Sequence, residues 1–151
     1  MSASSLTMPE AYTSNKFWVQ INSVLEAYFT ECSGLQIQTE VFEYKEGGLN
    51  TYSHKMPTRT TYNNITLKHG FSTSPLLWNW YRSTVNGKVK TENVTIMLFS
   101  SSGSVISLWN IENAYPVKWI GPTLNAKNNE AAIETVELAY SRFVTPLDAL
   151  L

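Results

Sequence analysis

The side chains best suited to catalysis are few and lie far apart in the sequence. They are two histidines, His54 and His69, one aspartate, Asp148, and one cysteine, Cys32. A Ser-His-Asp set would need Asp148, close to the C-terminal end, to be buried and held in place. No local motif supports pairing Cys32 with either histidine. The inventory therefore predicts no catalytic residues and a protein that is not an enzyme.

Metal and phosphate sites are also not indicated. The sequence contains neither HExxH nor CxxC, and its two histidines and one cysteine do not occur at ligand spacing. Glu43 and Glu46 flank Lys45 in a pattern typical of a solvated loop rather than of an acid/base pair. Gly47 and Gly48 lack the Gly-Lys-Ser/Thr ending of a phosphate loop. We expect no metal and no cofactor.

The charges favour contact with protein rather than with nucleic acid. Eleven basic residues are scattered among twelve acidic ones, and the densest basic group is only Lys88 and Lys90. That distribution offers no stripe for a phosphate backbone. Charged residues make up 15% of the chain, against about 25% in typical soluble domains. Ser, Thr and Asn fill the gap, and such a surface is inexpensive to desolvate against another protein.

Length and composition predict one folded domain over residues 1–151, with residues 1–14 as a mobile N-terminal arm. The N-terminal segment has no basic start and no continuous apolar stretch, so we expect no signal peptide and assembly in the cytoplasm. No run is long and apolar enough for membrane insertion. The single cysteine excludes an internal disulfide, and we expect Cys32 to fill a partly buried position.

The dominant hydrophobic period is two, which predicts antiparallel strands with one wet face. Ser100–Gly103 has the composition of a tight hairpin connection, so we expect the two runs that flank it to be neighbours. The strand-like runs cover residues 16–22, 34–44, 61–68, 92–100 and 103–119.

One segment has helical spacing, at about residues 74–86. Ser74 suits an N-cap and Pro75 the first helical position. A stripe of Leu77, Trp78, Tyr81 and Val85 predicts a seam that faces the core. In the C-terminal segment, residues 128–143 fit either a helix or a strand, and periodicity alone slightly favours the helix.

The stretch "EYKEGGLNTYSHKMP", Glu43–Pro57, lies between two strand-like runs. Its paired glycines, lone histidine and alternating charges are compatible with an active-site loop, a phosphate cradle or a contact surface for another copy of the chain. The residues alone leave these alternatives open.

Several ordered strings resemble one known family. They are "FTECSGLQIQTEVFEYKEGGLNTYSHKMP", "NNITLKHGFSTSPLLWNWY" and "NAYPVKWIGPTLNAKNNEAAIETVELAY". In this order and spacing they resemble the tail-tube protein of contractile-tailed phages and of phage-like extracellular contractile injection systems, from about Lys16 to Tyr140. The resemblance implies a mainly β fold, an antiparallel β-barrel or sandwich with one flanking α-helix, related to the type VI secretion tube protein. It also implies that residues 131–140 form a strand.

The same resemblance implies a structural role. Six copies would form a ring, and rings would stack into a hollow inner tube that a contracting sheath drives through a target envelope. The partners would be the sheath protein, baseplate and spike, and tube-initiator or terminator proteins. Effector cargo or DNA would pass through the lumen without sequence-specific binding, and the particle would be a phage tail or a released injector.

The segment Glu43–Pro57 would project from the barrel and contact neighbouring subunits. The predicted interface residues are Glu43, Lys45, Glu46, Gly47, Gly48, Asn50, Tyr52, His54, Lys55 and Pro57. The two glycines would supply unusual backbone angles or close approach, and the charged side chains would set register between copies. The alternative from another class is a monomeric, aromatic-rich β-sandwich that binds carbohydrate or peptide.

Overall fold

The computed structural model describes residues 16–21, 29–45, 47–48, 51–71 and 75–146. The predicted mobile arm at 1–14 lies outside this part of the chain. The elements in chain order are β1 (Phe17–Ile21), β2 (Glu31–Ser33), β3 (Ile37–Tyr44), β4 (His54–Tyr62), β5 (Ile65–Gly70), α1 (Leu76–Val85), β6 (Glu92–Phe99), β7 (Val105–Ile120), β8 (Ile133–Ala139) and β9 (Arg142–Val144).

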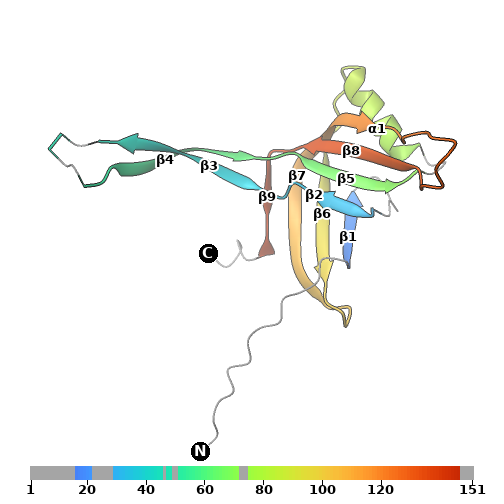
Figure 1. Cartoon of the computed structure of the whole chain (residues 1–151), viewed down its shortest axis with the longest axis horizontal. Helices are drawn as coiled ribbons and strands as arrows, with labels where there is room; N and C mark the ends of the chain where they lie inside the picture. The colour runs from blue at the N-terminus through green and yellow to red at the C-terminus, as the bar shows by residue number, and fades with distance from the viewer. Residues whose placement is uncertain (1–15, 22–28, 46, 49–50, 72–74, 147–151) are drawn as a thin grey trace, which may run out of the picture.

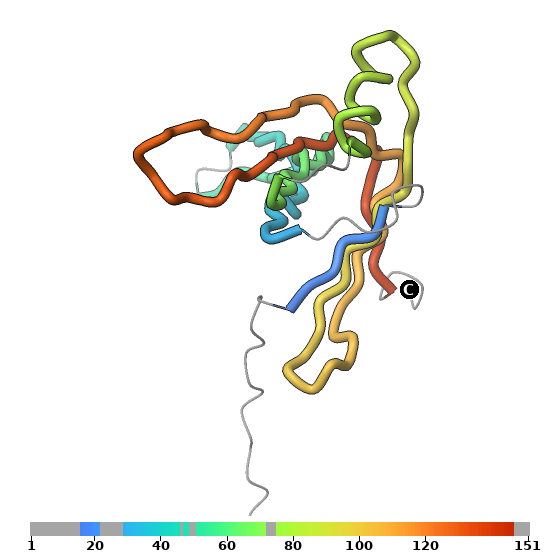
Figure 2. The backbone as a smooth tube through the Cα atoms, turned by 90° about the vertical axis from the view of Figure 1, so that its right-hand side faces the viewer, coloured from blue at the N-terminus to red at the C-terminus, as the bar shows by residue number. Residues whose placement is uncertain are grey.

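The body of the molecule consists of two antiparallel groups of strands that share the long strand β7. The order is β1-β6-β7-β8-β5-β2, and β9 pairs with β7. The first part of β7 pairs with β6 up to Ala114, and the second part pairs with β8 from Tyr115. The two groups cross (Figures 1 and 2). β1 and β2 end the strand order and are not paired with each other in the described residues, so the fold is an open barrel or sandwich, as predicted.

β7 changes partners at a local irregularity of the backbone. Asn113 has a positive φ of 56°, and the register between β6 and β7 shifts between Glu92 and Val94. The side chain of Asn93 accepts a hydrogen bond from the backbone N–H of Asn113 at 3.3 Å. Asparagine tolerates the left-handed region better than most residues. This bulge allows one strand to serve both groups.

The core lies between the two groups and under the helix. Its fully buried side chains include Ile21, Ile65, Leu67, Val94, Ile111, Val136 and Leu138. They alternate with more exposed residues along β6 and β8, as the period of two predicts. Residues 131–140 were ambiguous by periodicity, and the strand implied by the family resemblance is confirmed by β8.

The helix is confirmed, but its predicted face is partly wrong. It runs from Leu76 to Val85, and Ser74 lies outside the described residues. Leu77 and Trp80 are the buried residues, whereas Val85 is well exposed. The indole Nε1 of Trp80 donates a hydrogen bond to the carbonyl of Lys90 at 2.7 Å. This hydrogen bond ties the buried Trp80 to the segment that follows the helix.

Two strand predictions need correction. The alternating run 34–44 forms β3 only from Ile37 onward, and every side chain of β3 is exposed, so this strand has no buried face among the described residues. The run 61–68 is split between β4 and β5, which are separated at Asn63 and Asn64. Both differences have the same cause. In the described part of the chain, β3 and β4 pair only with each other and form a separate two-stranded sheet that leaves the body.

Candidate subunit interface

The most conspicuous surface is a two-stranded hairpin, formed by β3 and β4, that extends away from the body (Figure 1). We call it the projecting hairpin. Its pairing runs from Ile37 opposite Tyr62 out to Tyr44 opposite His54. A register shift between Thr39 and Val41 places a bulge near Pro57, where a residue without an N–H is tolerated.

Polar side chains add bonds across the inner half of the projecting hairpin. The hydroxyls of Thr39 and Thr60 are 3.1 Å apart. The hydroxyl of Thr58 donates to the carbonyl of Glu40 at 3.1 Å. Nearer the tip, Glu43 lies directly opposite Lys55, a cross-strand placement that favours opposite charges. These contacts hold the two strands in register without any core beneath them.

The projecting hairpin carries large apolar side chains that its own chain does not cover. Phe42 and Met56 are cross-strand neighbours, and each is 58% exposed. The other exposed apolar and aromatic side chains are Ile37, Val41, Tyr44 and Tyr52. An isolated two-stranded hairpin is marginal in water. Large apolar side chains left exposed on such a hairpin are typical of a contact site.

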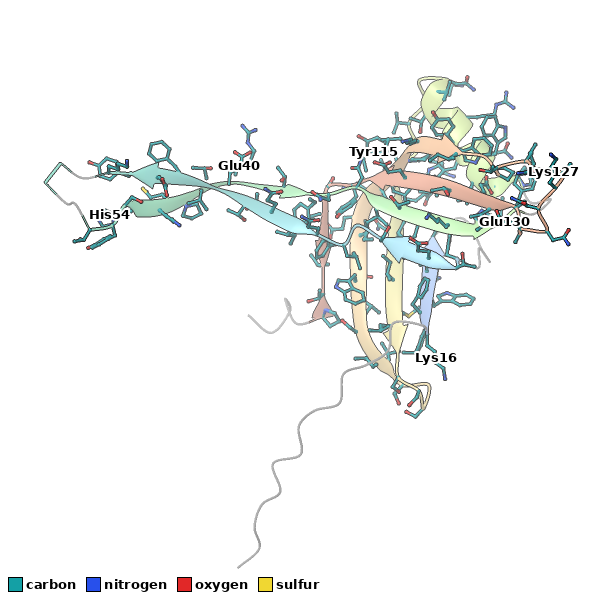
Figure 3. The ribbon with its side chains drawn as sticks, viewed as in Figure 1. Lys16, Glu40, His54, Tyr115, Lys127 and Glu130 are labelled. Carbon is teal, nitrogen blue, oxygen red and sulfur yellow. The ribbon has the colours of Figure 1, made fainter. Side chains whose placement is uncertain are left out.

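The predicted interface residues gather on the outer half of this hairpin. Glu43 and Tyr44 are the last two residues of β3, and Lys45 follows them. His54, Lys55 and Pro57 lie in β4. Figure 3 shows His54 far from the body. Glu46 and Asn50 lie outside the described residues. Gly48 has a φ of +98°.

The prediction did not name the exposed apolar side chains of the hairpin strands. Ile37, Val41 and Phe42 had been assigned to a half-buried strand, and Met56 had no assigned role. The alternation of apolar and polar residues in this run indicated a strand with an apolar face. A sequence pattern does not say whether such a face is covered by the same chain or by another.

A groove of about 320 Å³ opens between β1 and β2, which do not pair with each other in the described residues. Its lining is mainly apolar, from Phe17, Leu35, Ile96, Leu98 and Trp109, with Cys32 among them. Burial, and secondarily the nearby charge of Glu31, raises the pKa of the Cys32 thiol to about 11. The thiol is therefore protonated at neutral pH and is a poor nucleophile, as expected for a residue that fills space.

The sequence model of the T4-like virus tail tube protein gp19 family matches residues 13–144. The chain belongs to this family. A comparison with curated protein sequences gave no significant match. The tube protein thus has the family predicted from its ordered strings.

Solved structures agree with this assignment. The tube protein is 28% identical to a chain in the cryo-EM structure of the sheath-tube complex of an extracellular contractile injection system, PVC, in the extended state (TM-score 0.81, 96% of this chain and 97% of that chain). It is 27% identical to chains of the anti-feeding prophage, one in the 6-fold symmetrised baseplate (TM-score 0.81, 91% and 97%) and one in the tube-terminating cap (TM-score 0.82, 96% and 97%).

A more distant likeness shows the fold alone. Hcp1 from Flavobacterium johnsoniae is 11% identical, with a TM-score of 0.55 over 86% of this chain and 94% of that chain. The expected relation to the type VI secretion tube protein is thus confirmed at the level of architecture. The tube protein is a structural component of a phage tail or contractile injection system particle.

His69 and Glu134 are two titratable residues buried side by side in the main sheet. His69 Nε2 lies 2.7 Å from Glu134 Oε2, although the two groups are not aligned as in a good hydrogen bond. The other oxygen of Glu134 accepts a hydrogen bond from Trp119 Nε1. Phe29 packs edge-on against His69. One oxygen of the buried carboxylate therefore accepts a hydrogen bond, and the other lies against the His69 ring inside the sheet.

No group of three or more His, Cys, Asp and Glu side chains capable of holding a metal ion occurs among the described residues. In the same part of the chain, no helix has the length and apolar character needed to cross a membrane. His54 and His69 lie on different sheets, β4 and β5.

Proposed function

We propose that six copies of the tube protein form a ring and that rings stack into the hollow inner tube of a contractile injection system or phage tail. The observation that carries this proposal is the projecting hairpin, with apolar side chains exposed on a sheet that pairs with no other strand in the described part of the chain. Contacts with neighbouring copies would bury these side chains. The six-fold symmetry applied to the related prophage baseplate supports the copy number.

The open edges of the body supply a second reason for association. β1 and β2 are terminal strands of the sheet order, and β9 is a short strand beside β7. Unpaired strand edges bind other strands readily. When one face of a subunit joins a different face of the next, the chain of contacts closes into a ring or grows as a filament. Both outcomes are needed for stacked rings.

In this assembly the protein would act as a conduit and would catalyse nothing. Sheath contraction would drive the tube through a target envelope, and effector cargo or DNA would pass along the lumen. The partners would be the sheath protein, the baseplate and spike, and initiator or terminator proteins. Chains similar to this one occur in a sheath-tube complex, in a baseplate and in a tube-terminating cap. Assembly would take place in the cytoplasm before any release of the particle.

The test uses two valines with matched exposure. Val41 in β3 is 54% exposed, and Val89, in the connection after α1, is 52% exposed. Purified wild-type protein, or particles from the producing cell, should show rings or tubes by electron microscopy. Val41→Asp should abolish them because a carboxylate would be buried between copies. Val89→Asp, with the same change in chemistry, should preserve them.

A wild-type protein that stays monomeric at high concentration, together with particles that contain no tube of this protein, would overturn the proposal. Particles are included because an isolated tube protein can require an initiator. A monomer that binds glycans or peptides in a screen would instead support the carbohydrate- or peptide-binding alternative. Light scattering after size-exclusion chromatography measures the oligomeric state directly.

A further inference from the structure

The root of the projecting hairpin contains a cluster of three aromatic rings. Tyr62, the last residue of β4, is the single side chain of β3 and β4 that is not exposed. Its ring lies edge-on to Phe143 of β9, with centroids 5.3 Å apart and planes at 78°. It also packs against Tyr140, just after β8, at 5.9 Å and 63°. Tyr140 and Phe143 are themselves 6.3 Å apart.

The other contacts at the root fix its position rather than its direction. The backbone N–H of Asn63 donates to the carbonyl of Gln36 at 3.1 Å, which closes the base of the hairpin. The side chain of Asn64 donates to Glu137 Oε1 at 2.9 Å. Both contacts lie close to the point where the chain enters β5, so the hairpin could still pivot about them.

The Tyr62 ring is different because it presses sideways on the body. It is held between the end of β8 and β9, two segments that belong to the main sheet. Edge-to-face packing of aromatic rings has a preferred geometry. A ring fixed at the base of a ribbon therefore restricts the direction in which the ribbon leaves, in a way that a single backbone hydrogen bond does not.

We propose that Tyr62 is a positioning residue that sets the direction of the projecting hairpin through its packing against Tyr140 and Phe143. From Ile37 to Tyr44 the strand spans about 23 Å at roughly 3.3 Å per residue. A rotation of about 10° at the root then moves the outer end by about 4 Å, close to the spacing between paired strands. An error of that size would remove the hairpin from its docking surface on another copy.

The importance of this direction for assembly rests on the proposed tube function, whereas the direction itself is measurable in the monomer. Spin labels at Lys55→Cys on the hairpin and Lys118→Cys on β7, in a Cys32→Ala background, report the distance between hairpin and body. A narrow distance distribution is expected with Tyr62 present. Tyr62→Ala should broaden it or shift its mean by several ångströms.

Three variants separate positioning from folding. Tyr62→Phe should preserve the distribution because the packing uses the ring and not the hydroxyl. Tyr44→Ala removes an exposed tyrosine from the outer end and should leave the distribution unchanged. Tyr62→Leu keeps apolar bulk without the ring edge and should still broaden the distribution if Tyr62→Ala fails to fold. Circular dichroism melts identify which variants are folded.

A distance distribution that is the same in folded Tyr62→Ala or Tyr62→Leu as in the wild type would overturn the proposal, as would a broad distribution in the wild type. The same variants, examined by electron microscopy, should lose tubes while Tyr62→Phe retains them. If the wild type forms no tubes but the distances still depend on the Tyr62 ring, the positioning role stands and the tube function fails. The two proposals are therefore distinguishable.

Discussion

Gly34 connects β2 to the projecting hairpin at a point where the backbone has no room for a side chain. Its φ is +95°, and an ideal Cβ would lie 2.2 Å from the carbonyl oxygen of Asn64. The carbonyl carbon of Asn64 and the Cα of Ile65 would both be 3.3 Å away. These are backbone atoms at the start of β5, so they cannot rotate aside. Gly34→Ala must displace a core strand or fail to fold.

Gly103 provides the matched control. It has a φ of +90° in the connection between β6 and β7, but no atom would lie within 4 Å of its Cβ. Both alanine variants suffer left-handed backbone strain of about 1–2 kcal/mol. Only Gly34→Ala adds overpacking, which costs about 1–3 kcal/mol. Its total is then about 3 kcal/mol, against about 1 kcal/mol for Gly103→Ala once the lower entropy of the unfolded chain is included.

Thermal unfolding followed by circular dichroism measures the difference. At about 2–4 °C per kcal/mol for a domain of this size, Gly34→Ala should lower the Tm by about 6–12 °C and Gly103→Ala by about 2–4 °C. Equal shifts for the two variants would refute the reasoning, since they would show that β5 yields to the extra methyl group at no cost. A Tm for Gly34→Ala at or above the wild-type value would refute the backbone conformation as well.

Three further predictions concern the hairpin tip, a buried hydroxyl and the free thiol. Gly48→Val should leave the Tm within about 2 °C, because Gly48 has a φ of +98° at the hairpin tip, where strain is relieved by local opening rather than by unfolding of the core. The same variant should abolish tubes in electron micrographs; loss of the fold would contradict this. The hydroxyl of Tyr140 is buried without a hydrogen-bond partner among the described residues. Tyr140→Phe should therefore raise the unfolding free energy measured in urea by about 1 kcal/mol. A lower unfolding free energy would reveal a bond to that hydroxyl. Since burial raises the pKa of Cys32 from 9.0 to about 11, alkylation at about pH 8 should be roughly 100-fold slower in the folded protein than in urea. Stability should decline from pH 9.0 towards about 11, because the unfolded thiol ionises first; Cys32→Ala should remove that part of the decline, and equal alkylation rates would contradict the burial.

The parts of the fold that follow from sequence are those with one dry face inside the chain. β6 alternates buried Val94 and Ile96 with more exposed neighbours, and β8 does the same with Val136 and Leu138. The tight connection at Ser100–Gly103 was also predictable, because its residues suit a turn and the strands on both sides alternate. In each case local pattern and tertiary packing agree.

The helix face depends on information that periodicity does not contain. The stripe through Trp78 and Val85 is as regular as the observed buried pair, Leu77 and Trp80. Trp80 is the buried tryptophan of the helix, and the carbonyl of Lys90, in the connection after the helix, accepts a hydrogen bond from its indole. Trp78 instead packs on Trp119 of β7, with centroids 4.7 Å apart. Tertiary contacts thus select one of two similar helical faces.

The interface was predicted from family resemblance, and the residues alone could not have placed it. The charges at Glu43 and Lys55 are compatible with any solvated loop, and only the pairing of β3 with β4 shows them facing each other. The Tyr62 cluster was not predicted, because its partners Tyr140 and Phe143 are about 80 positions away in the sequence. No short-range pattern links residues at that separation.

The exposed apolar side chains Phe42 and Met56 are carried on a ribbon whose strands already pair with each other. An isolated two-stranded ribbon is only marginally stable in water. In the proposed tube, contact with another copy would cover these side chains and stabilise the ribbon. Order at the interface would thereby be coupled to correct docking, because a copy that approached at the wrong angle would leave these side chains exposed to water and would dissociate.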